Sequence, residues 1–316
     1  MIAPQTRTAT PALVGSAASV LLLALVASIP RSPFLPELPQ GVKPSGPLVW
    51  LADALALDSL HGNALVALGV VAAALGAAAL LLLLREAARG RISLRAVVLL
   101  SVAAHVVVVL LPVMFSRDVY SYIAYGRIGG LYHANPYVQT PVDFPADPIL
   151  SLVGHRWVDT PAVYGPLFTG VSALLTRSVR SIPALVTTFR LIAAATSLAT
   201  VALIGWTARR ERPERAAFAV AAFGLNPVIL FQSVGGGHND LLLALAVAAA
   251  FALALQDRAL LAVAVLALST LVKASAALPL LLLVVWVVAR RPEGTRLRAG
   301  LIHGGLAALI GFVVAA

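Results

Sequence analysis

Long apolar runs separated by short charged segments constrain this chain more than any other feature of its sequence. Four of these runs fall at residues 11–29, 61–84, 96–114 and 182–206. An α-helix needs about 20 apolar residues to cross the hydrocarbon core of a bilayer, where it satisfies its own backbone hydrogen bonds. Only 11% of the 316 residues are charged, whereas soluble domains carry about 25%. The sequence therefore predicts an all-α polytopic membrane protein.

Five further apolar runs bring the prediction to nine transmembrane helices in a single domain over residues 1–316. These runs cover 216–234, 241–255, 259–272, 275–289 and 300–316. The last run reaches the end of the sequence without a polar tail. We therefore expect the chain to be truncated at its C-terminus or to be part of something longer.

A long segment at 115–181 contains no run that could cross the membrane. Its most helical part, 166–179, is shorter than the roughly 20 residues that a span needs, so we expect an interfacial or re-entrant helix there. Long loops without regular structure are usually functional or disordered, and the aromatic residues of this one argue against disorder. A further interfacial helix is expected at 48–57, within a loop rich in proline and glycine.

The distribution of basic residues orients the predicted helices. Most of the 23 Lys and Arg residues lie in short loops that share one side if 166–179 does not cross. Because short cytoplasmic loops are enriched in Lys and Arg, that side is predicted to be cytoplasmic. We expect a multi-pass plasma-membrane protein whose segment 115–181 faces the extracytoplasmic side. The same rule accounts for the net charge of +10, so the expected partners include membrane lipids and no nucleic acid.

The segment 115–138, FSRDVYSYIAYGRIGGLYHANPYV, breaks the apolar character of the chain at once. Four of the six tyrosines lie between positions 120 and 132. If the segment is helical from Asp118, then Asp118, Tyr122 and Tyr125 share one helix face. A carboxylate can accept a proton from a hydroxyl, and aromatic rings can stack on the C–H face of a sugar. An interfacial aromatic belt with a solvated loop charge explains the same residues equally well.

Ionisable side chains at or inside a membrane are costly to bury, so they are candidates for function. Arg190, His238, Asp240 and Lys273 all fall near predicted outer ends of helices. The two long cations have a simpler explanation as well, because basic side chains can snorkel to lipid headgroups. His238 follows three glycines, which either let the backbone approach a ligand closely or form a plain turn.

Metal sites have little support in the sequence. The chain has no Cys, so it forms no disulfides and offers no thiolate ligands. It also lacks the HExxH motif that binds zinc on a helix. No metal site and no cofactor are therefore expected, and a divalent metal ion stays open as an alternative.

One carboxylate, several aromatic rings and several cations at an outer membrane face match the needs of a lipid-linked sugar phosphate. The phosphate needs Lys or Arg, the isoprenoid tail needs an apolar groove, and the sugar needs aromatic rings and a base. Since the lipid phosphate is a good leaving group, the protein need supply only position, charge and one base. A transporter or flippase of a lipid-linked sugar is the competing interpretation, but we find no convincing internal repeat of the kind that many transporters contain.

Several motifs resemble one known family. SRDVYSYIAYGRIGGLYHANPY, VYGPLF, NPVILFQSVGGGHND and LVKASAALP, spread over roughly residues 96–290, resemble the actinobacterial polyprenyl-phosphomannose-dependent α-1,6-mannosyltransferases of lipomannan assembly, within the GT-C superfamily. The resemblance implies a GT-C-like helical bundle with an acidic residue near the start of its first long outer loop, and Asp118 matches that position. Another GT-C enzyme with a different sugar donor is the nearest alternative.

The resemblance also implies a reaction and a set of roles. A single inverting displacement would move mannose from a polyprenyl-phosphate-linked donor to a glycolipid acceptor, with Asp118 as the base. The departing phosphate would be held by Lys273, Arg190 or His238. The residues expected to bind the sugar or the acceptor are Tyr122, Tyr125, Arg127, Asn135, Tyr137, Tyr164, Asn239 and Asp240.

Overall fold

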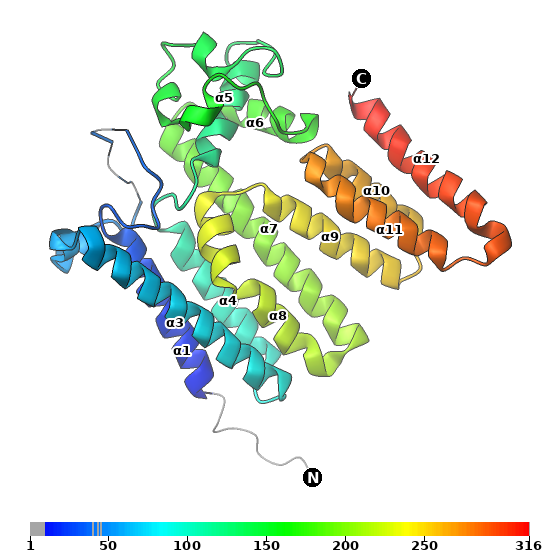
Figure 1. Cartoon of the computed structure of the whole chain (residues 1–316), viewed down its shortest axis with the longest axis horizontal. Coiled ribbons are helices and arrows are strands. Elements are labelled where there is room, and N and C mark those ends of the chain that lie inside the picture. Colours follow the sequence, from blue (N-terminus) through cyan, green and yellow to red (C-terminus); the bar gives the residue numbers. More distant parts are fainter. Residues whose placement is uncertain (1–9, 40, 43, 45, 316) are drawn as a thin grey trace. The chain divides into compact units, whose positions relative to one another are not determined.

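Every regular element in the described part of the chain is a helix (Figure 1). The computed structural model describes residues 10–39, 41–42, 44 and 46–315. It divides into a first unit, residues 1–119 with 186–238, and a second unit, residues 120–185 with 239–316. The prediction of an all-α polytopic membrane protein is confirmed.

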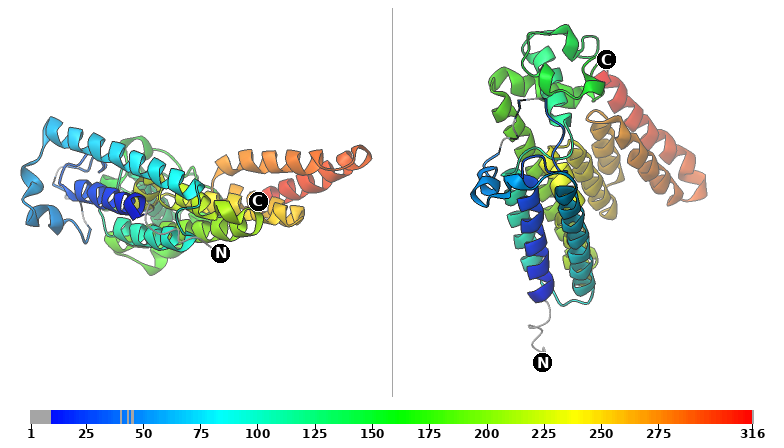
Figure 2. Two further views of the ribbon diagram at one scale, coloured as in Figure 1. Left: turned by 90° about the horizontal axis from the view of Figure 1, so that it is seen from below. Right: turned by 60° about the vertical axis from the view of Figure 1, so that its left-hand side comes forward.

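The first unit consists of membrane-type helices with small residues at their contacts. Its helices are α1 (Thr10–Ser28), α2 (Trp50–Ala54), α3 (Gly62–Ala88), α4 (Leu94–Val109), most of α7 (Ile182–Glu211) and α8 (Ala216–Gly224), with single 3-10 turns at Leu57–Ser59 and Pro213–Arg215. α3 packs against α1 and α8, and α1 and α3 lie side by side in both views of Figure 2. A Cβ on Gly76 of α3 would lie only 3.0 Å from Leu23 Cδ1. Small residues allow such close packing between membrane helices.

Three helices in the described part of the chain are long and apolar enough to cross a membrane, namely α1, α3 and α7. Pro213–Gly224 and the π-helix Val228–Val234 pass the same test as a pair that is bent by 42°. The shorter apolar helices are Leu94–Val109, Asp240–Leu255, Ala259–Thr270 and Ala274–Ala289. The total of nine spans therefore stays a prediction, and so does the interfacial position of 166–179.

The single span predicted at 216–234 is broken in its middle. α8 ends at Gly224, and the π-helix begins at Val228. Pro227 in the break has no N–H to donate, and Asn226 Oδ1 accepts a hydrogen bond from the Val228 N–H at 2.9 Å. The asparagine side chain thus supplies an acceptor where the regular helix has ended.

The second unit joins a polar segment to four apolar helices. Its helices are α5 (Asp118–Gly130, from Tyr120 onward), α6 (Pro166–Ser178), α9 (Asp240–Leu255), α10 (Ala259–Thr270), α11 (Ala277–Ala289) and α12 (Arg296–Ala315). Short 3-10 turns lie at Pro141–Asp143, Leu150–Leu152, His155–Trp157, Ala274–Ala276 and Glu293–Thr295. α10 packs against α9, α11 and α12, and a buried cluster of Ala250, Ala254, Ala262 and Leu266 fills part of this contact.

The helices α5 and α6 pack so closely that only glycine fits between them. A Cβ on Gly126 would lie 2.6 Å from the Ser172 carbonyl oxygen, and the Thr176 hydroxyl donates to the Gly126 carbonyl at 2.7 Å. Figure 1 shows both helices and the turns between them gathered together. The helices predicted from Asp118 onward and at 166–179 are confirmed as helices.

Candidate functional site

Asp118 and His238 form an acid–imidazole pair in the first unit. The Nδ1 atom of His238 lies 3.4 Å from Oδ2 of Asp118, and the two side chains are 11% and 31% exposed. Asp118 is the first residue of α5, and its backbone N–H donates to Ser116 Oγ at 3.1 Å. A carboxylate is favourable at a helix N-terminus because the helix dipole is positive there. The pair therefore combines a held carboxylate with partial access from outside.

Three consecutive glycines bring His238 to this place. A Cβ on Gly235 would lie 2.9 Å from Met114 Sδ, and a Cβ on Gly236 would lie 3.1 Å from the Met114 carbonyl oxygen. The Met114 N–H donates to the Gly235 carbonyl at 3.3 Å. Gly237 has a φ of +70°, which favours glycine. Larger residues would push these two segments apart and separate the acid–imidazole pair.

Arg190 lies inside the first unit and is only 4% exposed. Its Nη1 donates to the Leu111 carbonyl at 2.6 Å, and its Nη2 donates to the Val108 carbonyl at 2.7 Å. Carbonyl groups at the end of a helix lack partners within the helix, and a cation is favourable there. The guanidinium group therefore fixes the end of α4, just before the segment that leads to Asp118. The phosphate-holding role expected for Arg190 has no support in this geometry.

Lys273 and Asp240 form an exposed ion pair in the second unit. The Lys273 Nζ lies 2.7 Å from Oδ1 and 2.9 Å from Oδ2 of Asp240, and the side chains are 31% and 46% exposed. Asp240 is the first residue of α9, and Lys273 follows α10. An ammonium group has three N–H donors, so one remains for another acceptor. The structure thus brings together two residues for which the sequence predicted separate roles.

The loop before α6 is bonded to the segment that carries Lys273. The Leu167 N–H donates to the Leu271 carbonyl at 3.0 Å. A Cβ on Gly165 would collide with the same carbonyl oxygen, so the VYGPLF motif needs its glycine at this point. This hydrogen bond ties the loop that carries Tyr164 to the segment that carries Lys273.

Tyr122 belongs to a buried aromatic cluster rather than to an open surface. Its ring makes edge contacts with Tyr164 and Phe168, both with centroids 4.9 Å apart and planes at 87°. Its hydroxyl lies 3.4 Å from both Oδ1 and the backbone N of Asn239. Asn239 is 4% exposed, and its Nδ2 has no hydrogen-bond partner among the described residues. The Asn239 side-chain amide beside this cluster is therefore available to donate a hydrogen bond.

Tyr125 and Tyr137 differ in their access to solvent. The Tyr125 hydroxyl donates to the Thr160 carbonyl at 3.0 Å, and burial raises the pKa of Tyr125 to about 12, so the phenol stays neutral. The Tyr137 hydroxyl donates to the Tyr164 carbonyl at 2.9 Å, while its ring is exposed. Of the four tyrosines expected to bind a sugar, only Tyr137 therefore offers an open ring face.

Arg127 is buried in an ion pair that holds the 115–181 segment. Its Nε donates to Asp147 Oδ2 at 2.7 Å, and the side chains are 9% and 2% exposed. The Tyr132 hydroxyl donates to the same oxygen at 2.8 Å, and Asp147 Oδ1 accepts the Ile149 N–H at 3.0 Å. Burial and the hydrogen bond to Asp147 raise the pKa of Tyr132. These contacts tie distant parts of the segment together, which is a structural role.

Sequence reasoning missed two contributors to these arrangements. Asp147 gave no signal because its partner Arg127 lies 20 residues away along a loop. Ser116 was also overlooked, although a serine hydroxyl can accept the backbone N–H two residues further along the chain. Asn135, expected to bind a sugar or an acceptor, accepts the Tyr137 N–H at 2.9 Å and shapes the NPY turn.

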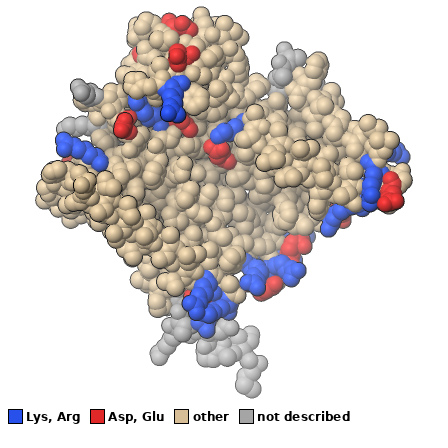
Figure 3. Space-filling model, in the orientation of Figure 1, with Lys and Arg blue, Asp and Glu red and all other residues tan. Residues whose placement is uncertain are grey.

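Charged side chains are few, and they lie in small groups on the surface. On the face shown in Figure 3, Lys and Arg form separate patches divided by broad surfaces of other residues. No group of three or more His, Asp or Glu side chains in the described part of the chain is placed to hold a metal ion. Among the described residues, the acid–imidazole pair and the Lys273–Asp240 pair each combine a carboxylate with a basic side chain and partial exposure at predicted site residues.

Comparison with known proteins agrees with the motifs. Residues 12–290 match the model of the alpha-(1->6)-mannopyranosyltransferase family, N-terminal domain. The chain is similar to alpha-(1->6)-mannopyranosyltransferase A of Mycobacterium tuberculosis, with 32% identity over 181 residues that cover 55% of this chain and 34% of the relative. It is also similar to alpha-(1->6)-mannopyranosyltransferase A of Corynebacterium glutamicum, with 31% identity over 55% of this chain and 35% of the relative.

The chain aligns with about a third of the length of each of these curated relatives. No solved structure matches it. The family model, by contrast, covers most of the chain, including every residue of the two exposed pairs. The chain therefore belongs to the alpha-(1->6)-mannopyranosyltransferase family and corresponds to its N-terminal domain.

Proposed function

We propose that this chain is part of a membrane mannosyltransferase. The enzyme moves a mannosyl residue from polyprenyl-phosphomannose to a glycan or glycolipid acceptor, forms an α-1,6 linkage with inversion, and acts in lipomannan-type assembly. Membership of the family supports mannosyl transfer. The observation that carries the chemistry is the partly exposed carboxylate of Asp118, held at a helix start beside His238.

The proposed reaction is a single displacement. The acceptor hydroxyl gives its proton to the Asp118 carboxylate as its oxygen bonds to the anomeric carbon of the donor. The bond between that carbon and the phosphate oxygen breaks, and polyprenyl phosphate leaves with the electron pair. A β-linked donor gives an α-linked product because attack comes from the opposite face. The imidazole of His238, 3.4 Å from Asp118, orients the carboxylate toward its substrate.

Lys273, Asn239 and Tyr137 are the groups proposed for the phosphate and the sugar. The Lys273 ammonium keeps one N–H for a phosphate oxygen while Asp240 holds the other two. Asn239 offers its Nδ2 as a donor to a sugar hydroxyl, and Tyr137 offers an exposed ring. Tyr122, Tyr125 and Tyr164 are buried, so their proposed role is to support the sugar-binding groups and not to stack on the sugar.

A donor-discrimination assay tests the proposal. Membranes with and without the protein are supplied with mannose-labelled polyprenyl phosphate or with labelled GDP-mannose. We expect label in an alkali-stable glycan only from the polyprenyl donor. Transfer from GDP-mannose alone would contradict the proposed donor. Movement of the labelled lipid across the membrane without a new glycosidic bond would favour the transporter interpretation.

The extracytoplasmic position of the site is part of the proposal, and cysteine labelling tests it. The chain has no native Cys, so Glu211→Cys at the end of α7 and Asp159→Cys in the 115–181 segment each create a single thiol. We expect a membrane-impermeant maleimide to label position 159 from outside and position 211 only after permeabilisation. The reverse pattern would overturn the orientation.

A further inference from the structure

A cavity of about 650 Å³ in the second unit is lined by three arginines from three different segments. Arg258 precedes α10, Arg291 lies between α11 and α12, and Arg298 lies in the first turn of α12. No single element creates this arrangement, because α10 must pack against α12 to bring the three side chains to one cavity. The convergence is therefore a property of the folded unit.

The charge of this cavity is not neutralised within the described residues. Arg258, Arg291 and Arg298 form no salt bridge there, and Asp257 is the one carboxylate on the wall. The neighbouring Arg296 differs from these three arginines, because it forms an ion pair with Glu293 at 3.5 Å and does not line the cavity. The residues that line the cavity thus carry a net positive charge, which favours an anionic ligand.

His303 supplies a second and independent sign of a ligand. It lines the cavity from α12 and is only 5% exposed. Its Nδ1 lies 2.7 Å from the Ala299 carbonyl, so Nδ1 must be the donor, since a carbonyl only accepts. Its Nε2 is buried and has no hydrogen-bond partner among the described residues. With Nδ1 as the donor, Nε2 of the neutral ring is an acceptor. Buried polar atoms are normally paired, so a ligand hydroxyl in the cavity would complete this bond.

Apolar surface lies directly beside these charges. Leu260, Leu261 and Ile302 line the same cavity and are each about half exposed. A small soluble anion would leave this apolar surface without contacts, whereas a membrane lipid has acyl chains to cover it as well as a charged headgroup. Basic pockets between membrane helices are known to bind anionic headgroups.

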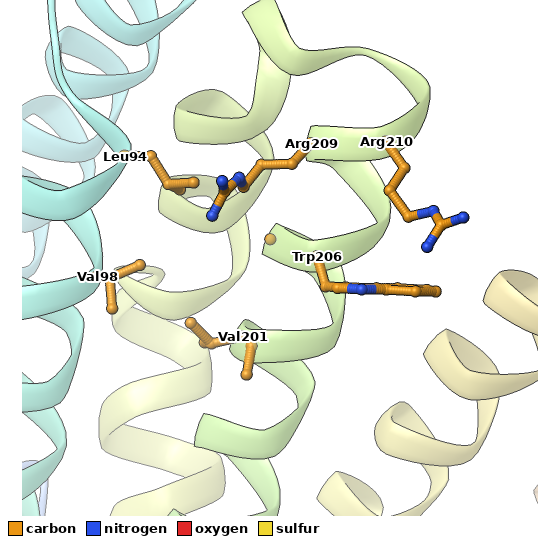
Figure 4. A pocket seen from close by; sticks show the side chains of 8 residues that line it. Leu94, Val98, Val201, Trp206, Arg209 and Arg210 are labelled. Atoms are coloured by element: carbon orange, nitrogen blue, oxygen red, sulfur yellow. The ribbon is translucent and has the colours of Figure 1, made fainter.

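We propose that this cavity binds the headgroup of an anionic membrane phospholipid, with Arg258, Arg291 and Arg298 on the phosphate, His303 Nε2 accepting from a headgroup hydroxyl, and the leucines on an acyl chain. The proposal rests on the membrane character of the protein and not on its transferase activity. A comparable basic cavity of about 500 Å³ in the first unit carries Arg209, with Arg210 over the Trp206 ring (Figure 4). Its wall has no buried polar atom that lacks a partner, so it carries no such inference.

The test uses the full chain, delipidated and returned to nanodiscs of phosphatidylcholine with a small fraction of phosphatidylglycerol. Native mass spectrometry counts the retained lipid of each class. We expect retained phosphatidylglycerol in the wild type and an approximately tenfold weaker retention in Arg298→Gln, because the substitution removes one charged hydrogen-bond donor from the phosphate. Arg296→Gln is the matched control, since it removes the same charge from the same helix turn outside the cavity.

Three outcomes would overturn the proposal. The first is an equal loss in Arg296→Gln and Arg298→Gln, and the second is no preference for phosphatidylglycerol over phosphatidylcholine. The third is competition by millimolar inorganic phosphate that removes the lipid completely, which would make the ligand a free anion. If Arg298→Gln does not fold, Arg258→Gln provides the same test from a different segment.

Discussion

Two ion pairs in the second unit have the same length and opposite surroundings. The Arg127–Asp147 and Lys273–Asp240 pairs each have a shortest N–O distance of 2.7 Å. Arg127 and Asp147 are 9% and 2% exposed, whereas Lys273 and Asp240 are 31% and 46% exposed. Asp147 also accepts hydrogen bonds from Tyr132 and Ile149, so its carboxylate is fully engaged.

The difference in burial separates an ion pair that holds the structure from one that we propose takes part in binding. A buried pair cannot exchange partners without leaving an uncompensated charge, and breaking one is strongly destabilising. An exposed pair contributes little to stability and can take a new partner at little cost. The first unit repeats the contrast, because Arg190 is buried on backbone carbonyls while Asp118 is partly exposed.

Asp118→Asn provides the largest expected effect on activity. The substitution keeps the shape of the side chain and removes the proposed base, and loss of general-base catalysis typically reduces rates by about 10²–10⁴-fold. We expect mannosyl transfer to fall at least about a hundredfold with unchanged thermal unfolding and donor binding. Transfer in membranes and melting of the purified protein are the two measurements.

Asp159→Asn is the matched control for Asp118, because it removes an exposed carboxylate from the same long segment. We expect wild-type transfer from this variant. Near-normal transfer by a well-expressed Asp118→Asn protein would remove Asp118 as the base and direct attention to Asp240.

Arg127→Gln provides the largest expected effect on stability. It leaves Asp147 charged and buried, and removing one partner of a buried pair costs about 3–5 kcal/mol. We expect a lower melting temperature and early proteolysis within 115–181. The exposed Arg89 offers a control, since Glu86 keeps Arg91 as a partner at 3.0 Å after Arg89→Gln. Equal melting of both variants would contradict the structural role of Arg127.

Lys273→Ala tests the exposed ion pair of this comparison, Lys273–Asp240. Because one N–H of the ammonium group is proposed to hold the donor phosphate, and charged hydrogen bonds contribute about 1.5–3 kcal/mol, we expect the donor KM to rise about tenfold or more. Melting should change little, since exposed pairs stabilise weakly. A wild-type KM together with a lower melting temperature would make this pair structural, like Arg127–Asp147.

Gly165→Ala has the smallest expected effect. Its Cβ would collide with the Leu271 carbonyl, and overpacking costs about 1–3 kcal/mol. Gly170→Ala is the control in α6, because a Cβ there meets nothing within 4 Å and alanine stabilises a helix interior by about 0.5–1 kcal/mol. Chemical denaturation of the two variants should therefore move in opposite directions. Equal shifts would show that the loop does not need this close contact.

Much of the fold was predictable because hydrophobic runs are a strong signal over whole helices. The ends of the runs were less predictable. The run at 96–114 contains a helix that ends at Val109, since Pro112 disfavours helix in the residue before it. The broken span at 216–234 also contains a proline, Pro227, and beside it the Asn226 side chain accepts the Val228 N–H.

The site was predictable in its residue types and not in its contacts. Asp118 and His238 were both selected from sequence. They lie 120 positions apart along the chain, and nothing in the sequence shows that the fold brings them into contact. Arg127 was selected as part of a motif expected to bind the sugar or acceptor, and Arg190 as a cation at a helix end expected to hold phosphate. Both are buried on partners that lie 20 and 79 residues away. Such pairings arise from packing, which a single sequence does not display.

The bonds of Arg190 have a consequence for how the protein responds to acid and salt. Its acceptors are the backbone carbonyls of Val108 and Leu111, which do not titrate, and a guanidinium group stays protonated in proteins. Buried contacts are also screened weakly by salt. These two bonds between α7 and the end of α4 therefore contain no acceptor whose protonation could change, and neither acid nor salt should weaken them by altering the acceptors.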